Sequence, residues 1–75
     1  MMRRYYYIEI PGLGYEHTWT LHSLSKKVYT HFTFWTDEDG RRCLGQWHTS
    51  EILADKYRPK NTDLKFHGKY EVSPR

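Results

Sequence analysis

Hydrophobic and polar residues alternate with a period of two along most of this chain. In the segment 4–10, Tyr6, Ile8 and Ile10 share one side of the backbone and the residues between them share the other. Such alternation of β-branched and aromatic side chains is typical of a β-strand. The pattern recurs, and it predicts strands near residues 4–10, 15–22, 28–36 and 43–48.

An Asp39-Gly40 pair separates the third and fourth predicted strands and favours a two-residue type I′ hairpin turn. The resulting cross-strand pairs include Asp37 with Arg42, Glu38 with Arg41, Phe32 with Trp47 and His31 with His48. The alternative is a type I turn over residues 37–40 with a bulge at Gly40, which shifts every partner by one. We prefer the first register because it sets two pairs of opposite charge beside the turn.

The second half of the chain predicts one helix and a further strand-forming segment. Thr49 or Ser50 can cap a helix near residues 50–58, which Pro59 terminates. Residues 64–72 predict a C-terminal strand or a small hairpin about His67-Gly68-Lys69. The expected fold is therefore α+β and mostly β. It is a single domain, residues 1–75, in which a four-stranded antiparallel meander carries one short helix and a C-terminal strand or small hairpin.

The composition supports a folded domain although aliphatic residues are few. Leu, Ile, Val and Phe account for 14 of 75 residues, just under the roughly 20% level at which disorder is suspected. However, the chain has 13 aromatic residues and a net charge of only +3, so aromatic burial can replace aliphatic burial. The lone Cys43 cannot form an internal disulfide, which fits a reducing compartment. No apolar stretch approaches the roughly 18 residues of a membrane span, and we expect a cytoplasmic protein.

The alternation also sorts the side chains into two faces. One face carries the apolar residues, including Val28, and is expected to form a core covered by the helix. The residues expected to be buried are Ile8, Ile10, Trp19, Phe32, Phe34, Trp47, Ile52 and Leu53. Cys43 is expected to point into the same core as a small hydrophobic residue.

The other face combines aromatic rings that have polar tips with threonine and histidine, a composition enriched in contact surfaces. A partner-binding surface is expected from Trp35, Tyr29, Tyr7 and His31, with charge contributed by Arg3, Arg4, Lys26, Lys27, Arg41 and Arg42. Because strands reverse direction at each turn, the basic residues should form one cluster at each end of the sheet.

No catalytic or cofactor motif accompanies this surface, so a non-enzymatic interaction protein without a cofactor is the preferred interpretation. Viral or phage accessory proteins that inhibit a host nucleic-acid-processing or defence enzyme often have this size and character. The main alternative is a module that binds single-stranded nucleic acid through base stacking and phosphate contacts. A homodimer formed through a free strand edge is a further alternative.

The histidines add two weaker hypotheses. If His31 faces His48 across a hairpin, two imidazoles come within chelating reach, but two ligands do not make a metal site. No metal is therefore expected. The same pair beside cationic residues could cleave RNA by general acid–base transfer, which makes a small ribonuclease the further alternative.

Overall fold

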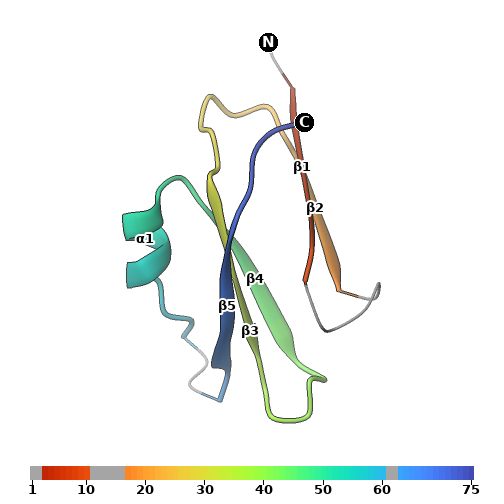
Figure 1. Ribbon diagram of the computed structural model, residues 1–75, viewed down its shortest axis with the longest axis vertical. Helices are drawn as coiled ribbons and strands as arrows, with labels where there is room; N and C mark the ends of the chain where they lie inside the picture. Colours follow the sequence, from red (N-terminus) through yellow and green to blue (C-terminus); the bar gives the residue numbers. More distant parts are fainter. Residues whose placement is uncertain (1–2, 11–16, 61–62) are drawn as a thin grey trace.

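The computed structural model describes residues 3–10, 17–60 and 63–75 and shows a mostly β fold with one short helix. Its elements are β1 (Arg4–Glu9), β2 (Thr18–Ser23), β3 (His31–Thr36), β4 (Cys43–His48), α1 (Glu51–Lys56) and β5 (Lys65–Glu71). The predicted fold class is confirmed, and the helix and the strands predicted near 4–10 and 43–48 lie within their predicted ranges (Figure 1). The strand predicted over 28–36 begins at residue 31. The strand predicted over 15–22 is observed from residue 18, and positions 15 and 16 lie outside the described residues. No described helix has the length and apolar character needed to cross a membrane.

The hairpin of β3 and β4 has the predicted register. His31 pairs with His48 and Phe32 with Trp47. The turn, however, is not type I′, because that turn needs a positive φ at both central residues. Gly40 has a φ of +70°, and no non-glycine residue in the described part of the chain has a positive φ.

Asp37 explains how the turn keeps this register. Its backbone N–H donates to the Arg42 carbonyl at 3.1 Å, and its carbonyl accepts from Gly40 at 3.2 Å. Its carboxylate accepts the backbone N–H groups of Arg41 and Arg42 at 3.0 and 3.3 Å. Asp37 therefore caps the turn through its side chain, as an Asx-type residue does.

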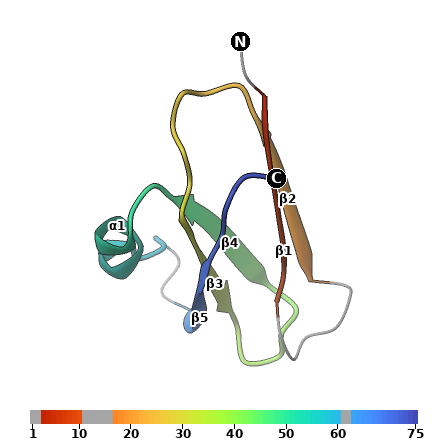
Figure 2. The ribbon, with the colours of Figure 1, turned by 45° about the horizontal axis from the view of Figure 1, so that its top comes forward.

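The strands form two antiparallel sheets, which corrects the expectation of a single four-stranded meander. One sheet holds β1 and β2, and the other has the order β4-β3-β5. Described residues of β2 and β3 do not pair. The segment 24–30 between them is mostly exposed and carries the chain from one sheet to the other, as Figure 2 shows.

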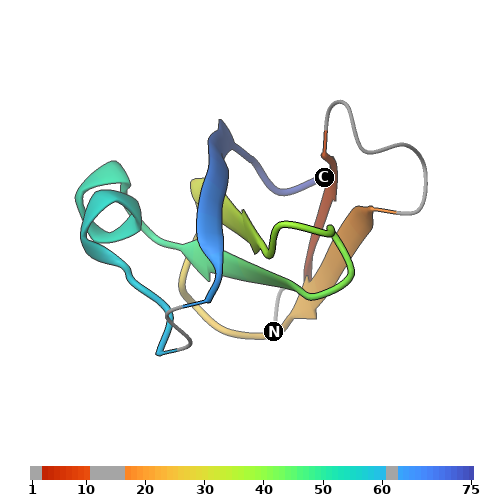
Figure 3. The ribbon, with the colours of Figure 1, turned by 90° about the horizontal axis from the view of Figure 1, so that it is seen from below.

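The core lies between the two sheets. Ile10, Phe32 and Phe34 are buried there, with Trp19 and Trp47 packed against them. Figure 3 shows the sheet of β3 with β1 and β2 on one side and α1 on the other. The expectation that the helix covers the apolar face is therefore wrong, because the β1–β2 hairpin covers it.

The helix rests on the opposite face of the β3 sheet and turns a small residue toward it. Ser50 caps it by accepting the Leu53 N–H at 3.2 Å. Ala54 is buried, whereas Ile52 and Leu53 are 66% and 51% exposed. The two larger residues were expected in the core, but the six-residue helix approaches the sheet through the alanine instead.

The last strand resolves the choice left open for residues 64–72. β5 is continuous and pairs antiparallel with β3, so that Phe66 lies opposite Trp35 and Tyr70 opposite Phe32. The alternative of a hairpin about residues 67–69 is wrong. β3 is consequently flanked by strands at both edges, and four of its six residues are buried.

Candidate interaction surface

The structure does not bring the four predicted aromatic contact residues together. Trp35 is only 6% exposed, because Phe66 and Tyr57 pack against its ring at centroid distances of 5.2 and 6.3 Å. Tyr29 is half-buried beside the Tyr6 ring. Tyr7 lies in the other sheet, on β1.

The cations are distributed as the sequence predicts. Arg3 and Arg4 lie at the end of the molecule where β2 passes into β3, which is also the end where the C-terminus lies (Figure 1). The Arg4 guanidinium donates to the Ser25 carbonyl at 2.9 Å, which holds the loop that carries Lys26 and Lys27 against β1. Arg41 and Arg42 lie in the β3–β4 turn at the opposite end.

A fifth cation joins the first cluster. The Arg75 N–H donates to the Tyr5 carbonyl at 2.7 Å, and its guanidinium lies over the Tyr7 ring, 4.9 Å from the centroid. We call Arg3, Arg4, Lys26, Lys27 and Arg75 the basic end. The position of Arg75 could not be predicted from the sequence, because Arg75 reaches β1 only through the path of the segment after β5.

The charges at the two ends differ in how they are neutralised. At the turn end, Arg42 lies 3.7 Å from the Asp63 carboxylate and Lys65 lies 3.4 Å from the Glu38 carboxylate. These pairs replace the cross-turn pairs that the sequence suggested. At the basic end, none of the five cations forms an ion pair with a carboxylate of the described residues. Its positive charge is therefore available to a partner.

Two exposed apolar side chains accompany these charges. Leu24 is 55% exposed and Val28 is 42% exposed, on either side of Lys26 and Lys27. Val28 was expected in the core, but β3 begins three residues later and leaves it in the loop. Apolar groups interleaved with uncompensated cations make a surface that combines hydrophobic anchors with electrostatic attraction.

The outer face of the β1–β2 hairpin continues from the basic end. Tyr5 and His22 are cross-strand partners whose ring centroids lie 4.7 Å apart. The Tyr7 hydroxyl donates to the Glu9 carboxylate, and this bond raises the pKa of the Tyr7 phenol. With Arg75 over its ring and Glu9 at its hydroxyl, Tyr7 is already engaged within the chain.

The predicted histidine pair exists, but it is covered. His48 is 6% exposed and is hydrogen-bonded through Nε2 to the Thr33 hydroxyl at 2.7 Å. His31 is bonded through Nδ1 to the Thr30 hydroxyl at 2.8 Å. No group of three metal-ligating side chains occurs among the described residues. Cys43, expected in the core, is exposed because it opens the edge strand β4.

The His48 environment predicts a pH-dependent stability. Burial, and to a smaller extent the neighbouring His31, hold the pKa of His48 below its usual range. The folded chain therefore binds fewer protons at this site than the unfolded chain does. We expect the free energy of unfolding to have its full value at pH values above the unfolded histidine pKa, roughly 6.5. It should decline as the pH falls below that value.

Melting temperatures measured from pH 5 to 8 test this expectation. His48→Gln should flatten the pH dependence of the melting temperature. The matched control His67→Gln removes an exposed imidazole and should leave the dependence in place. An unchanged slope in His48→Gln would assign the acid sensitivity to another group.

None of the protein-family models, curated proteins or solved structures compared with this chain matches it.

Proposed function

We propose that this chain is a non-enzymatic interaction protein that binds an acidic surface of a protein partner through the basic end. The observation that carries the proposal is the set of five cations without a carboxylate partner in the described structure, two of which lie in the same loop as exposed Leu24 and Val28. In this proposal Trp35 stabilises the fold, and the partner contacts come from the basic residues and the two apolar side chains.

The two parts of the surface support different steps of binding. Positive potential concentrated at one end accelerates the encounter with an acidic partner and orients it. Leu24 and Val28 would then lose exposed apolar area, which stabilises the complex once it has formed. A surface made of cations alone would give fast association but weak retention.

The size of the chain and the character of its surface support a proposal for the class of partner. A small domain that covers an acidic patch on a larger enzyme is the arrangement used by accessory proteins that inhibit a host enzyme. Enzymes that process nucleic acid, or that defend a cell against it, are the partner class proposed here. An inhibitor of this kind acts by occupying a surface, so the proposal requires no catalytic group in this chain.

Single-stranded nucleic acid is the second candidate, and one observation favours it. Tyr5 and His22 lie on the outer face of the β1–β2 hairpin, which begins beside the same cations. Bases could stack on such rings while Arg3 and Arg4 contact phosphates. We place it second because Tyr7 is already covered by Arg75, whereas the exposed apolar residues of the loop suit a protein partner.

A charge reversal tests the proposed function. The tagged full chain is used to recover partners from nuclease-treated lysate of the source cells, beside a Lys26→Glu/Lys27→Glu variant. We expect one stoichiometric protein with the unmodified chain and at least a tenfold lower recovery with the variant, because like charges now oppose the acidic partner. The matched control is Lys56→Glu/Lys60→Glu, which reverses two exposed lysines outside the basic end.

Two results would contradict the protein partner. Equal recovery by both double variants would show that the basic end is not the contact surface. Loss of every partner after nuclease treatment would instead favour nucleic acid. In that case, the binding of a labelled single-stranded oligonucleotide should weaken steeply with salt, because each phosphate contact releases counterions.

A further inference from the structure

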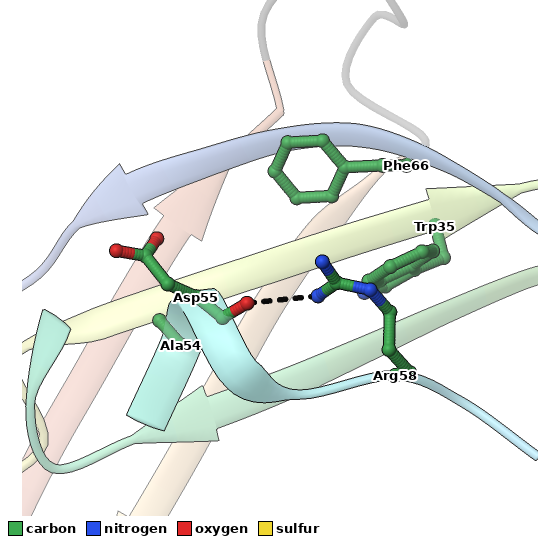
Figure 4. Close-up of a pocket in the computed structure, with 5 residues that line it drawn as sticks. All are labelled: Trp35, Ala54, Asp55, Arg58 and Phe66. Atoms are coloured by element: carbon green, nitrogen blue, oxygen red, sulfur yellow. Dashed lines mark hydrogen bonds between the residues drawn. The ribbon is translucent and has the colours of Figure 1, made fainter. Parts of the chain in front are cut away.

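A cavity of about 250 Å³ opens between α1, β3 and β5, away from the basic end. Its lining residues are Trp35, Ala54, Asp55, Arg58 and Phe66. Figure 4 shows Phe66 and Arg58 on opposite sides of this space, with Trp35 beside both. The residues come from a strand centre, a helix, the segment after that helix and an edge strand, so only the folded chain assembles them.

Aromatic side chains form the walls. The Trp35 ring is 6% exposed, whereas Phe66 is 56% exposed and meets it edge to face at a centroid distance of 5.2 Å. Ala54 lies on the helix side with only a methyl group, so no larger side chain fills the space there. Because these two rings already touch, a flat ligand ring would lie against the exposed part of Phe66, beside Trp35.

The cavity also carries one cation without an anionic partner. The Arg58 guanidinium lies 5.9 Å from the Trp35 centroid. Its Nη1 donates to the carbonyls of Asp55 and Tyr57 at 2.8 and 2.7 Å. No carboxylate of the described residues pairs with it. The two carbonyls therefore use the donors of Nη1, and the remaining N–H groups of the guanidinium can donate to an anion.

The carboxylate of the lining shares one ammonium group with a second carboxylate. Asp55 accepts from Lys69 Nζ at 2.7 Å, and the same ammonium lies 3.1 Å from Glu51. The two carboxylates hold the pKa of Lys69 above its ordinary value, so the ammonium stays charged. Two carboxylates and one ammonium leave one negative charge on this side, so a bound anion would turn toward Arg58 and away from Asp55.

One buried donor beside the cavity is unsatisfied. The indole Nε1 of Trp35 is enclosed and has no hydrogen-bond acceptor in the described structure. A buried donor without a partner is destabilising.

We propose that this cavity binds a small planar aromatic carboxylate, with the ring against the exposed Phe66 side chain beside Trp35 and the carboxylate on Arg58. The volume supports the size of the ligand, because pockets of roughly 300–1,000 Å³ hold drug-sized molecules and this one is smaller. A single ring with one carboxyl group fits that volume. The site is independent of the basic end, so its failure would leave the proposed function untouched.

A nuclear magnetic resonance titration of the full chain with sodium benzoate tests the site. The Trp35 indole N–H signal, assigned by its loss in Trp35→Phe, should shift and saturate with a dissociation constant on the order of 1 mM, as expected for a ligand of this size. Benzamide keeps the ring without the charge, and cyclohexanecarboxylate keeps the charge without the flat ring. The affinity of each should be lower than that of benzoate by a factor of about ten or more.

Variants separate this site from non-specific association. Arg58→Gln should weaken benzoate about tenfold or more, since it removes a charged hydrogen bond. The matched control Lys60→Gln changes a neighbouring exposed cation outside the lining and should bind as the unmodified chain does. Ala54→Leu fills the cavity and should abolish binding. Phe66→Ala removes a half-exposed aromatic side chain of the lining and should also weaken benzoate binding. It provides the test if Ala54→Leu does not fold.

Two results would overturn the proposal. One is a Trp35 indole signal that does not move at saturating benzoate. The other is equal affinity in the unmodified chain, Arg58→Gln and Phe66→Ala, which would place the benzoate elsewhere on the surface.

Discussion

Replacing Phe32 by alanine should lower the free energy of unfolding by roughly 3–5 kcal/mol. Phe32 is completely buried at the centre of the three-stranded sheet. Its ring meets Trp47 at a centroid distance of 4.6 Å and Trp19 at 5.6 Å, so it joins the two sheets. Removing it leaves a void that the two indoles cannot close without leaving their own contacts. The loss approaches the whole stability of a small domain, about 5–15 kcal/mol.

Chemical denaturation followed by tryptophan fluorescence measures this loss. Ile52→Ala is the control, because Ile52 is 66% exposed and its truncation should change stability by no more than about 0.5 kcal/mol. A Phe32→Ala variant with a nearly unchanged transition would show that the core is not organised around this ring.

Adding a single methyl group at Gly45 should also destabilise the fold strongly. A Cβ at Gly45 would overlap the Phe32 Cζ and lie 3.0 Å from Phe32 Cε1 and 3.1 Å from Trp19 Cδ2. Phe32 is buried and cannot turn away, so the sheets must separate locally. We expect Gly45→Ala to lower the free energy of unfolding by roughly 1–3 kcal/mol or more.

Gly68→Ala is the matched comparison, because both glycines lie opposite Phe34 on the two neighbouring strands. The nearest atom there is the Tyr70 hydroxyl oxygen at 2.5 Å, the far end of a side chain that is only half-buried. That ring can move, so Gly68→Ala should be tolerated better. Equal losses in the two variants, measured by the same denaturation experiment, would contradict the close approach at Gly45.

The alternation predicts the strands and the β3–β4 register because both depend on residues close in sequence. Phe32 and Trp47 lie one hairpin apart, and the Asp37–Arg42 segment can settle their pairing locally. Alternation assigns a residue to a face but does not say which sheet that face belongs to. For this reason the separation of β1 and β2 from β3 could not be predicted, and neither could the burial of Trp35 by Phe66 and Tyr57.

The candidate surface was predictable in its placement but not in its charge balance. Chain reversal at each turn was enough to place Arg4 beside Lys26 at one end. The neutralisation of Arg42 depends on Asp63, which approaches the turn only because β5 pairs with β3. Contacts between segments so far apart in the sequence leave no local signal. The cavity could not be predicted for the same reason, because its lining residues come together only when β5 pairs with β3.

The position of β5 also has a consequence during synthesis. Until β5 has been made, the edge of β3 that faces β5 has no partner, and the β3 sequence, HFTFWT, contains no Asp, Glu, Lys or Arg. An uncharged, aromatic strand with an open edge is a template for pairing with another chain. We therefore expect β5 to limit aggregation of the chain as well as to complete the sheet. Chains that stop before Lys65 should accumulate in the insoluble fraction of the cell to a greater extent than chains that include β5.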